Sequence, residues 1–167
     1  MEPVPATFEK PEDEKRKYLK VLLLKGFVDG KPVTKMLVDG GAAVNIMPYA
    51  MLRKLGKSNE DLTKMDTMLK DFEGVVSPAV GALCVDLTIG SKTLPSTFFV
   101  INGKRFYSLL LGRDWIHANY CIPSTMHALV YYTMDRRCCW SCFRRSIMQY
   151  CVSRSLWVEL WKGKLFL

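Results

Sequence analysis

The stretch MLVDGGAAVNI, residues 36–46, joins two apolar runs through an aspartate and two glycines. Glycine adopts backbone angles that other residues resist, so Asp39-Gly40-Gly41 predicts a tight turn between two strands. An aspartate at this point would have an exposed carboxylate on a fixed backbone, which suits a catalytic acid. Asp-Gly is also a common turn dipeptide. Taken alone, the segment favours a structural turn aspartate and leaves the catalytic interpretation open.

Short apolar runs separated by turn residues surround this stretch. Asp29-Gly30, a favoured dipeptide of two-residue hairpins, separates the first two runs. Pro48 suits the first turn of a short helix over residues 49–55, and Gly112 begins a second helical pattern. Strands are predicted at residues 21–28, 32–38, 44–47, 83–89, 94–101 and 108–111. Many short strands with one or two small helices predict an all-β fold, as a closed or a sandwiched barrel.

Composition divides the 167 residues into three zones. Residues 1–18 are charged and contain proline, as in a solvated arm or linker. Residues 19–127 hold the strand-and-turn pattern and are predicted to form the folded domain, which is large enough to bury a core. Residues 128–167 carry four of the six cysteines and three of the four tryptophans. This divergent tail is predicted to lie outside the core and to carry no partner for the sheet.

Charge and hydropathy argue against several classes of protein. No apolar run approaches the roughly 20 residues that a membrane span needs, so no membrane partner is expected. The first residues, MEPVP, lack the pattern of a secretory signal, so an intracellular, cytoplasmic location with reduced cysteines is expected. The net charge of +8 comes largely from residues 128–167, which hold 7 Lys/Arg against 2 Asp/Glu. A basic tail is a weak signal for nucleic-acid binding, which is therefore not the favoured function.

A second motif changes the interpretation of Asp39. The segment LGRDWIHAN, residues 111–119, places an apolar strand before Gly112-Arg113-Asp114, with Gly112 lying 73 residues (112 − 39) after Asp39. An apolar strand into Asp-Gly-Gly-Ala, then a hairpin-rich stretch, then apolar-apolar-Gly-Arg-Asp, resembles the retropepsins. The sequence of residues 39–48 and 111–119 is similar to that of protease segments in plant gypsy-type retrotransposon polyproteins. The resemblance covers roughly residues 20–127.

This resemblance implies a retropepsin-like closed barrel with a flap hairpin and one catalytic aspartate in each chain. Asp39 would be the catalytic carboxylate, facing its copy in a homodimer, and the substrate would be a polypeptide. Arg113 and Asp114 would be structural, tying the C-terminal helix to the active-site loop. That loop would contain Gly40, Gly41 and Ala42. The flap tip would contain Phe72, Glu73, Gly74, Val75 and Val76. The mechanism implied uses no cofactor and no metal ion.

One position departs from the family pattern. Retropepsins usually carry Ser or Thr between the aspartate and the glycine, where this chain has Gly40. That hydroxyl normally joins a hydrogen-bond network across the dimer, and a lost buried hydrogen bond costs on the order of 1 kcal/mol in each chain. Two functions therefore stay open. The chain is an active aspartic endopeptidase, or a catalytically degenerate barrel that binds peptides or dimerises.

Other site chemistries have weaker support in the sequence. Cys139, Cys142 and Cys151 have part of a zinc-knuckle spacing, but no histidine lies at residues 143–150 to complete four ligands. The histidines, His117 and His127, adjoin no nucleophile motif. No phosphate-binding glycine loop is present in the sequence. Metal, Ser/His and nucleotide chemistries are therefore not predicted.

Overall fold

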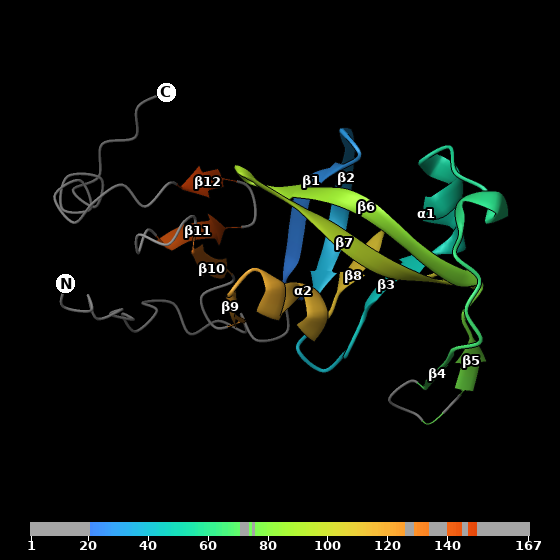
Figure 1. The fold of residues 1–167 in the computed structure, drawn as a ribbon. Helices are drawn as coiled ribbons and strands as arrows, with labels where there is room; N and C mark the ends of the chain where they lie inside the picture. Colours follow the sequence, from blue (N-terminus) through green and yellow to red (C-terminus); the bar gives the residue numbers. More distant parts are fainter. Residues whose placement is uncertain are drawn as a thin grey trace, which may run out of the picture.

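Six strands close into a barrel in the order β1-β2-β8-β3-β7-β6 (Figure 1). The computed structural model describes residues 21–70, 74, 76–125, 129–133, 140–144 and 147–149. The barrel strands are β1 (Leu23–Val28), β2 (Lys31–Val38), β3 (Asn45–Pro48), β6 (Gly81–Ile89), β7 (Lys92–Ile101) and β8 (Leu109–Leu111). Each lies within two residues of a strand predicted from the sequence. The all-β class is confirmed, and the closed barrel replaces the sandwich as the arrangement.

The first hairpin is built by the predicted Asp-Gly turn. Strands β1 and β2 pair antiparallel with Val28 opposite Lys31, which leaves two residues in the turn. Asp29 has φ 46° and Gly30 has φ 76°, as a two-residue turn with both central residues left-handed requires. Asp29 also accepts a 2.9 Å hydrogen bond from the Asp86 N–H and pairs with Lys57 at 3.1 Å. Asp29 is therefore a structural aspartate.

The barrel interior follows the period of two that a strand imposes. In β6, Leu83, Val85 and Leu87 are buried, whereas Cys84 and Asp86 between them are exposed. Strand β8 departs from this alternation, because all three of its leucines are buried. It lies between β2 and β3 in the barrel and also contacts helix α2 (Arg113–Ala118), so both of its faces are covered.

Two short helices flank the barrel, as the sequence predicts. Helix α1 (Tyr49–Lys54) follows Pro48, and the chain leaves it at Gly56, whose φ is 76°. Lys31 donates from its ammonium group to the carbonyl of Leu55 at 2.6 Å, which ties the first hairpin to the end of α1. A single 3-10 turn, η2 (Asn59–Asp61), comes next and is capped by Ser58. No helix in the described part of the chain is long and apolar enough to cross a membrane.

A small hairpin stands off the barrel. Strands β4 (Met68–Lys70) and β5 (Val76–Pro78) pair antiparallel with each other and form a separate two-stranded sheet. Figure 1 shows the hairpin projecting from the end of the barrel where the segment from α1 arrives. A two-stranded hairpin is marginally stable in isolation, so this element depends on contacts beyond its own pairing.

The start of the tail belongs to the folded domain, contrary to the sequence-based prediction. Strand β10 (Leu129–Thr133) pairs with β9 (Ile122–Ser124), and Val130 is fully buried in the same core cluster as the barrel residues. The apolar pair Leu129 and Val130 supplies this burial, although the surrounding composition is unlike the barrel's. Strands β11 (Trp140–Arg144) and β12 (Ile147–Gln149) extend the sheet. The predicted arm, residues 1–18, lies outside the described residues.

Candidate active site

Asp39 lies at the end of β2, where the barrel fixes its backbone. Strand β2 runs parallel to β8 with Met36 opposite Leu109 and Val38 opposite Leu111. The Asp39 N–H then donates a 3.0 Å hydrogen bond to the carbonyl of Leu111. The Asp39 side chain is half-buried. The predicted strand-to-turn position is confirmed, and it leaves the carboxylate accessible where strands β2 and β8 end side by side.

The turn after Asp39 is held by the aspartate itself. The Gly41 N–H donates to Asp39 Oδ1 at 2.8 Å, which orients the carboxylate. Neither Gly40 nor Gly41 has a positive φ, so the expectation that the turn uses backbone angles reserved for glycine is wrong. Gly40 is exposed, and a Cβ added to it would meet no atom within 4 Å. The loop therefore has conformational and steric room for a side chain at position 40.

Asn45 fixes the side of the loop that faces helix α2, and the sequence analysis did not identify this residue. The side chain of Asn45 is buried, with 1% of its surface exposed. Its Nδ2 donates to Asp114 Oδ2 at 2.9 Å and to the Thr97 carbonyl at 3.0 Å. Its Oδ1 accepts from the Gly112 N–H at 3.0 Å. One amide thus joins β3, β7 and α2, and a polar residue within the apolar run of residues 44–47 was the sequence signal for it.

Gly112 is the point of closest approach between the loop and α2. A Cβ at this position would collide with the Val44 carbonyl and would stand 2.9 Å from the Ala42 carbonyl oxygen. The next two backbone N–H groups bond to the loop, from Arg113 to Ala42 at 2.9 Å and from Asp114 to Ala43 at 3.2 Å. Glycine at position 112 is therefore required by space, and the backbone after it holds the loop.

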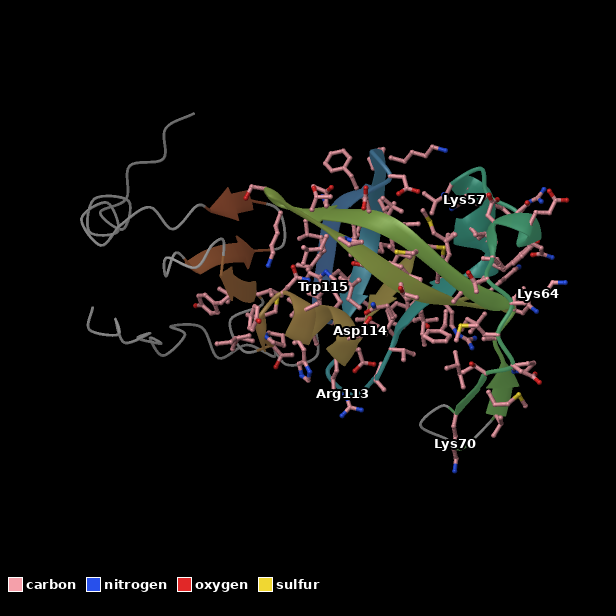
Figure 2. All side chains as sticks on the ribbon, in the orientation of Figure 1. Lys57, Lys64, Lys70, Arg113, Asp114 and Trp115 are labelled. Atoms are coloured by element: carbon pink, nitrogen blue, oxygen red, sulfur yellow. The ribbon has the colours of Figure 1, made fainter. Side chains whose placement is uncertain are left out.

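Arg113 and Asp114 use their side chains differently. The Asp114 carboxylate accepts a hydrogen bond from Asn45 and so connects helix α2 to strand β3. This contact is structural, as was expected of Asp114. The Arg113 guanidinium forms no hydrogen bond or ion pair with any residue that the structure describes. Figure 2 shows Arg113 on the outer side of α2, whereas Trp115 faces the barrel, where it is buried. The link between this helix and the loop is made by backbone groups and Asp114.

Two of the predicted flap residues, Gly74 and Val76, lie at the β4–β5 hairpin. Gly74 has φ 85°, a turn conformation, and Val76 is 49% exposed at the start of β5. Phe72, Glu73 and Val75 lie outside the described residues. An antiparallel hairpin is therefore present at the predicted place.

Tyr107 is a further residue near Asp39 that the sequence analysis did not identify. Its ring is half-buried in the segment before β8 and packs edge-to-face on Phe106, with ring centroids 5.3 Å apart. Burial raises the pKa of the Tyr107 hydroxyl, Arg105 opposes this shift through its charge and a hydrogen bond, and the negative charge of Asp39 adds to it. Tyr107 therefore lies within the electrostatic field of Asp39 and stays protonated.

Metal and thiol chemistry find no site in the described part of the chain. Within those residues, no group of three or more His, Cys, Asp or Glu side chains is placed to hold a metal ion. Cys121 is buried, and burial raises the pKa of its thiol to about 12, so it is not a nucleophile at physiological pH. The three cysteines of the zinc-knuckle spacing are not among the side chains that the structure describes.

Residues 24–118 match a family model described as "gag-polyprotein putative aspartyl protease". The matched segment contains Asp39, the β4–β5 hairpin and helix α2, and it spans more than half of the chain. The chain belongs to this family. The shared segment runs from β1 to the last residue of α2, so the family assignment rests on the barrel and not on the tail.

One solved structure supports the fold of this aspartyl protease-family domain. The retroviral protease-like domain of Ddi1 from Leishmania major is 16% identical, with a TM-score of 0.53 over 68% of this chain and 84% of that one. The EIAV protease complexed with the inhibitor HBY-793 is 16% identical (TM-score 0.49, 59% and 88% covered). A retropepsin-like aspartic protease from Rickettsia conorii is 19% identical (TM-score 0.48, 61% and 75% covered). A search of curated proteins found no match.

Proposed function

We propose that this chain is an aspartic endopeptidase that cleaves peptide bonds as a homodimer, with Asp39 of each copy forming the catalytic pair. The observation that carries the proposal is the geometry of Asp39, whose carboxylate is half-buried, oriented by the Gly41 N–H and accessible at the end of barrel strand β2. The sequence contains one Asp-Gly-Gly-Ala segment, and a two-carboxylate site therefore needs a second copy. A two-fold dimer is the commonest symmetric assembly and would place both loops at its axis.

The chemistry follows from two like charges held close together. Two adjacent carboxylates cannot both ionise without a large electrostatic cost, so the pair retains one proton, as the carboxylate pairs of aspartic proteases do. The ionised carboxylate takes a proton from water as the water oxygen attacks the peptide carbonyl. The protonated carboxyl gives its proton to the carbonyl oxygen, and a later transfer to the nitrogen releases the amine. Activity is therefore expected to peak below neutral pH.

The surrounding elements fit a peptide substrate. The β4–β5 hairpin projects beyond the barrel and carries Met68 and Val76 with exposed side chains. An extended peptide between this hairpin and the Asp39 loop would cover those apolar side chains. Exposed apolar groups of this kind often mark a binding surface. Phe72, Glu73 and Gly74 would then form part of the flap tip over the substrate.

The wider context of the domain is also a proposal. We place it in the polyprotein of a plant gypsy-type retrotransposon, acting in the cytoplasm, because residues 39–48 and 111–119 read like those protease segments and the family model is a gag-polyprotein protease. Sequencing the gene on both sides of this frame tests the placement. Flanking gag and reverse-transcriptase frames would support it, and a host gene on both sides would contradict it.

The test of the proposed activity is a cleavage assay on a peptide library at acidic pH. Asp39→Asn is expected to abolish cleavage without loss of stability, since amide and carboxylate are nearly isosteric. Asp86→Asn is the matched control, because Asp86 is exposed on β6 and distant in the chain from the loop. Cleavage by Asp39→Asn, or a strict monomer in sedimentation up to millimolar concentration, would contradict the proposal.

Gly40 supports a second candidate, a degenerate barrel that binds peptides or dimerises without cleaving them. Position 40 has no hydroxyl to offer a partner loop, although it has space for one. In this case the wild-type chain binds library peptides or dimerises but leaves them intact. Binding without cleavage, together with cleavage by Gly40→Ser, would select the degenerate protease over the active one.

A further inference from the structure

The segment between β7 and β8 is a basic and aromatic loop. Lys104, Arg105 and Phe106 are exposed, and the Phe106 ring is 62% exposed although it contacts Tyr107. Exposed aromatic side chains on a loop beside cations indicate a contact surface more readily than they indicate a folding requirement.

This loop is fixed at a defined distance along the strand from Asp39. The Ser108 N–H donates to the Lys35 carbonyl at 2.9 Å, which anchors the end of the loop on β2. Strand β8 then runs beside β2 until Leu111 accepts from the Asp39 N–H. The four steps from Tyr107 to Leu111 span at most about 13 Å, the length of a fully extended chain. An extended peptide of about four residues therefore reaches from the Asp39 carboxylate to this loop.

Arg105 is held in place but keeps most of its donors. Its Nη1 donates to the Lys104 carbonyl at 3.4 Å, and its positive charge acts on the Tyr107 hydroxyl. Among the residues that the structure describes, no carboxylate forms an ion pair with Arg105. A guanidinium offers five N–H donors in a planar fork that matches a carboxylate. Arg105 is therefore a positioned cation without an acidic partner in the described chain.

We propose that Arg105 recognises an acidic side chain of the polypeptide substrate within about four residues of the bond to be cleaved. Lys104 adds positive charge, and Phe106 covers the apolar stem of the bound side chain. Tyr107 follows in the chain and packs edge-to-face on Phe106, which helps to keep the loop in place. The inference rests on the proposed function, since it takes Asp39 as the place where the peptide bond is cleaved.

The test compares matched peptides that differ in one residue, Glu or Gln, at each of the four positions on either side of the cleaved bond. For the wild-type dimer, kcat/KM is expected to be about fivefold higher with Glu at one of these positions, the size of effect that one exposed ion pair gives. Arg105→Glu should reverse the preference, and Arg105→Lys should keep a weaker one. Lys54→Glu, an equal charge change on α1, should leave the preference as in wild type.

A binding measurement separates this inference from the proposed activity. Fluorescence anisotropy with the Asp39→Asn chain should show the same preference for the Glu peptide, and adding Arg105→Gln should remove it while both peptides still bind. A Glu preference in binding without any cleavage by wild type upholds the role of Arg105 and removes the proposed activity. Cleavage that is indifferent to Glu and Gln at all eight positions, or a preference that survives Arg105→Glu, overturns the role of Arg105.

Discussion

The loop that carries Asp39 has two sides that differ in how tightly they are held. On the inner side, Gly112 approaches the loop so closely that no Cβ fits, and Asn45 makes three hydrogen bonds while buried. At the outer tip, Gly40 is exposed and has no atom within 4 Å of where its Cβ would be. Both sides contain a glycine, but one is required by packing and the other is not.

This difference separates the folding requirements of the loop from its proposed functional surface. The inner contacts are made within one chain, so they should act on the free energy of unfolding of the monomer. The tip makes no packing contact at Gly40 within the described chain, and a residue there can act on an approaching second copy. Substitutions on the two sides should therefore have effects of different size and on different measurements.

The largest effect is expected from Gly112→Ala. The added methyl group must displace the Val44 and Ala42 carbonyls, and overpacking of this kind typically costs about 3 kcal/mol. Gly40→Ala is the matched control, and it should leave stability unchanged or raise it by up to about 1 kcal/mol, because the unfolded chain loses freedom. Urea denaturation of both variants measures the contrast. Equal effects at the two positions would show that the inner side is not the tighter one.

A smaller loss is expected when Asn45 is replaced. Asn45→Ala leaves the Gly112 N–H and the Asp114 carboxylate without their buried partner, at a cost of about 2 kcal/mol. Asn45→Asp keeps the acceptor for Gly112 but places a second carboxylate beside Asp114. Like charges raise the pKa of the pair in the folded state above the ordinary value of about 4. Asn45→Asp should therefore be least stable at neutral pH and should recover as the pH falls from that raised pKa to about 4.

Urea midpoints of wild type, Asn45→Ala and Asn45→Asp at pH 7 and pH 4 test this expectation. Asn45→Ala adds no titrating group to the site, so its deficit relative to wild type should change less between the two pH values than that of Asn45→Asp. An Asn45→Asp deficit that is unchanged at pH 4 would mean that the two carboxylates do not face each other.

The elements that the sequence predicted well are those specified by short-range chemistry. Asp29-Gly30 dictates a two-residue hairpin, and alternating apolar residues dictate barrel strands such as β6. Pro48 and Gly56 bound α1 through their own backbone preferences. The strand-to-turn position of Asp39 follows from the same local rules. The prediction that Asp39 is catalytic came from the resemblance to a family, because an isolated Asp-Gly turn gives no information about a partner carboxylate.

The features that the sequence did not predict depend on contacts between distant segments. Asn45 meets Thr97 and Asp114 across 52 and 69 residues of chain, and no local pattern encodes those distances. Val130 lies in a region whose composition differs from that of the barrel, yet its side chain is buried in the hydrophobic core. At Gly40 a local rule misled, because the turn proved compatible with ordinary backbone angles. Composition and propensity describe segments, whereas these outcomes are set by what each segment packs against.

The smallest effect on the stability of the monomer is expected from Gly40→Ser. Because the monomer should be unchanged, any effect of this variant on dimerisation or cleavage can be assigned to contacts between two copies. The exposed, uncrowded position should accept a hydroxymethyl group with a change in unfolding free energy within about 0.5 kcal/mol. If two copies bring their Asp39 loops together, the new hydroxyl can donate across the axis, and a hydrogen bond in each copy would add about 1 kcal/mol to association. Sedimentation velocity at several concentrations should therefore show a tighter dimer for Gly40→Ser, while Gly40→Ala matches wild type.

Peptide cleavage should rise in the serine variant alone, because a more rigid pair of loops keeps both Asp39 carboxylates correctly placed. A serine variant that destabilises the monomer by more than the alanine variant would mean that the tip is packed after all, and equal dimerisation of all three chains would mean that the loops do not meet.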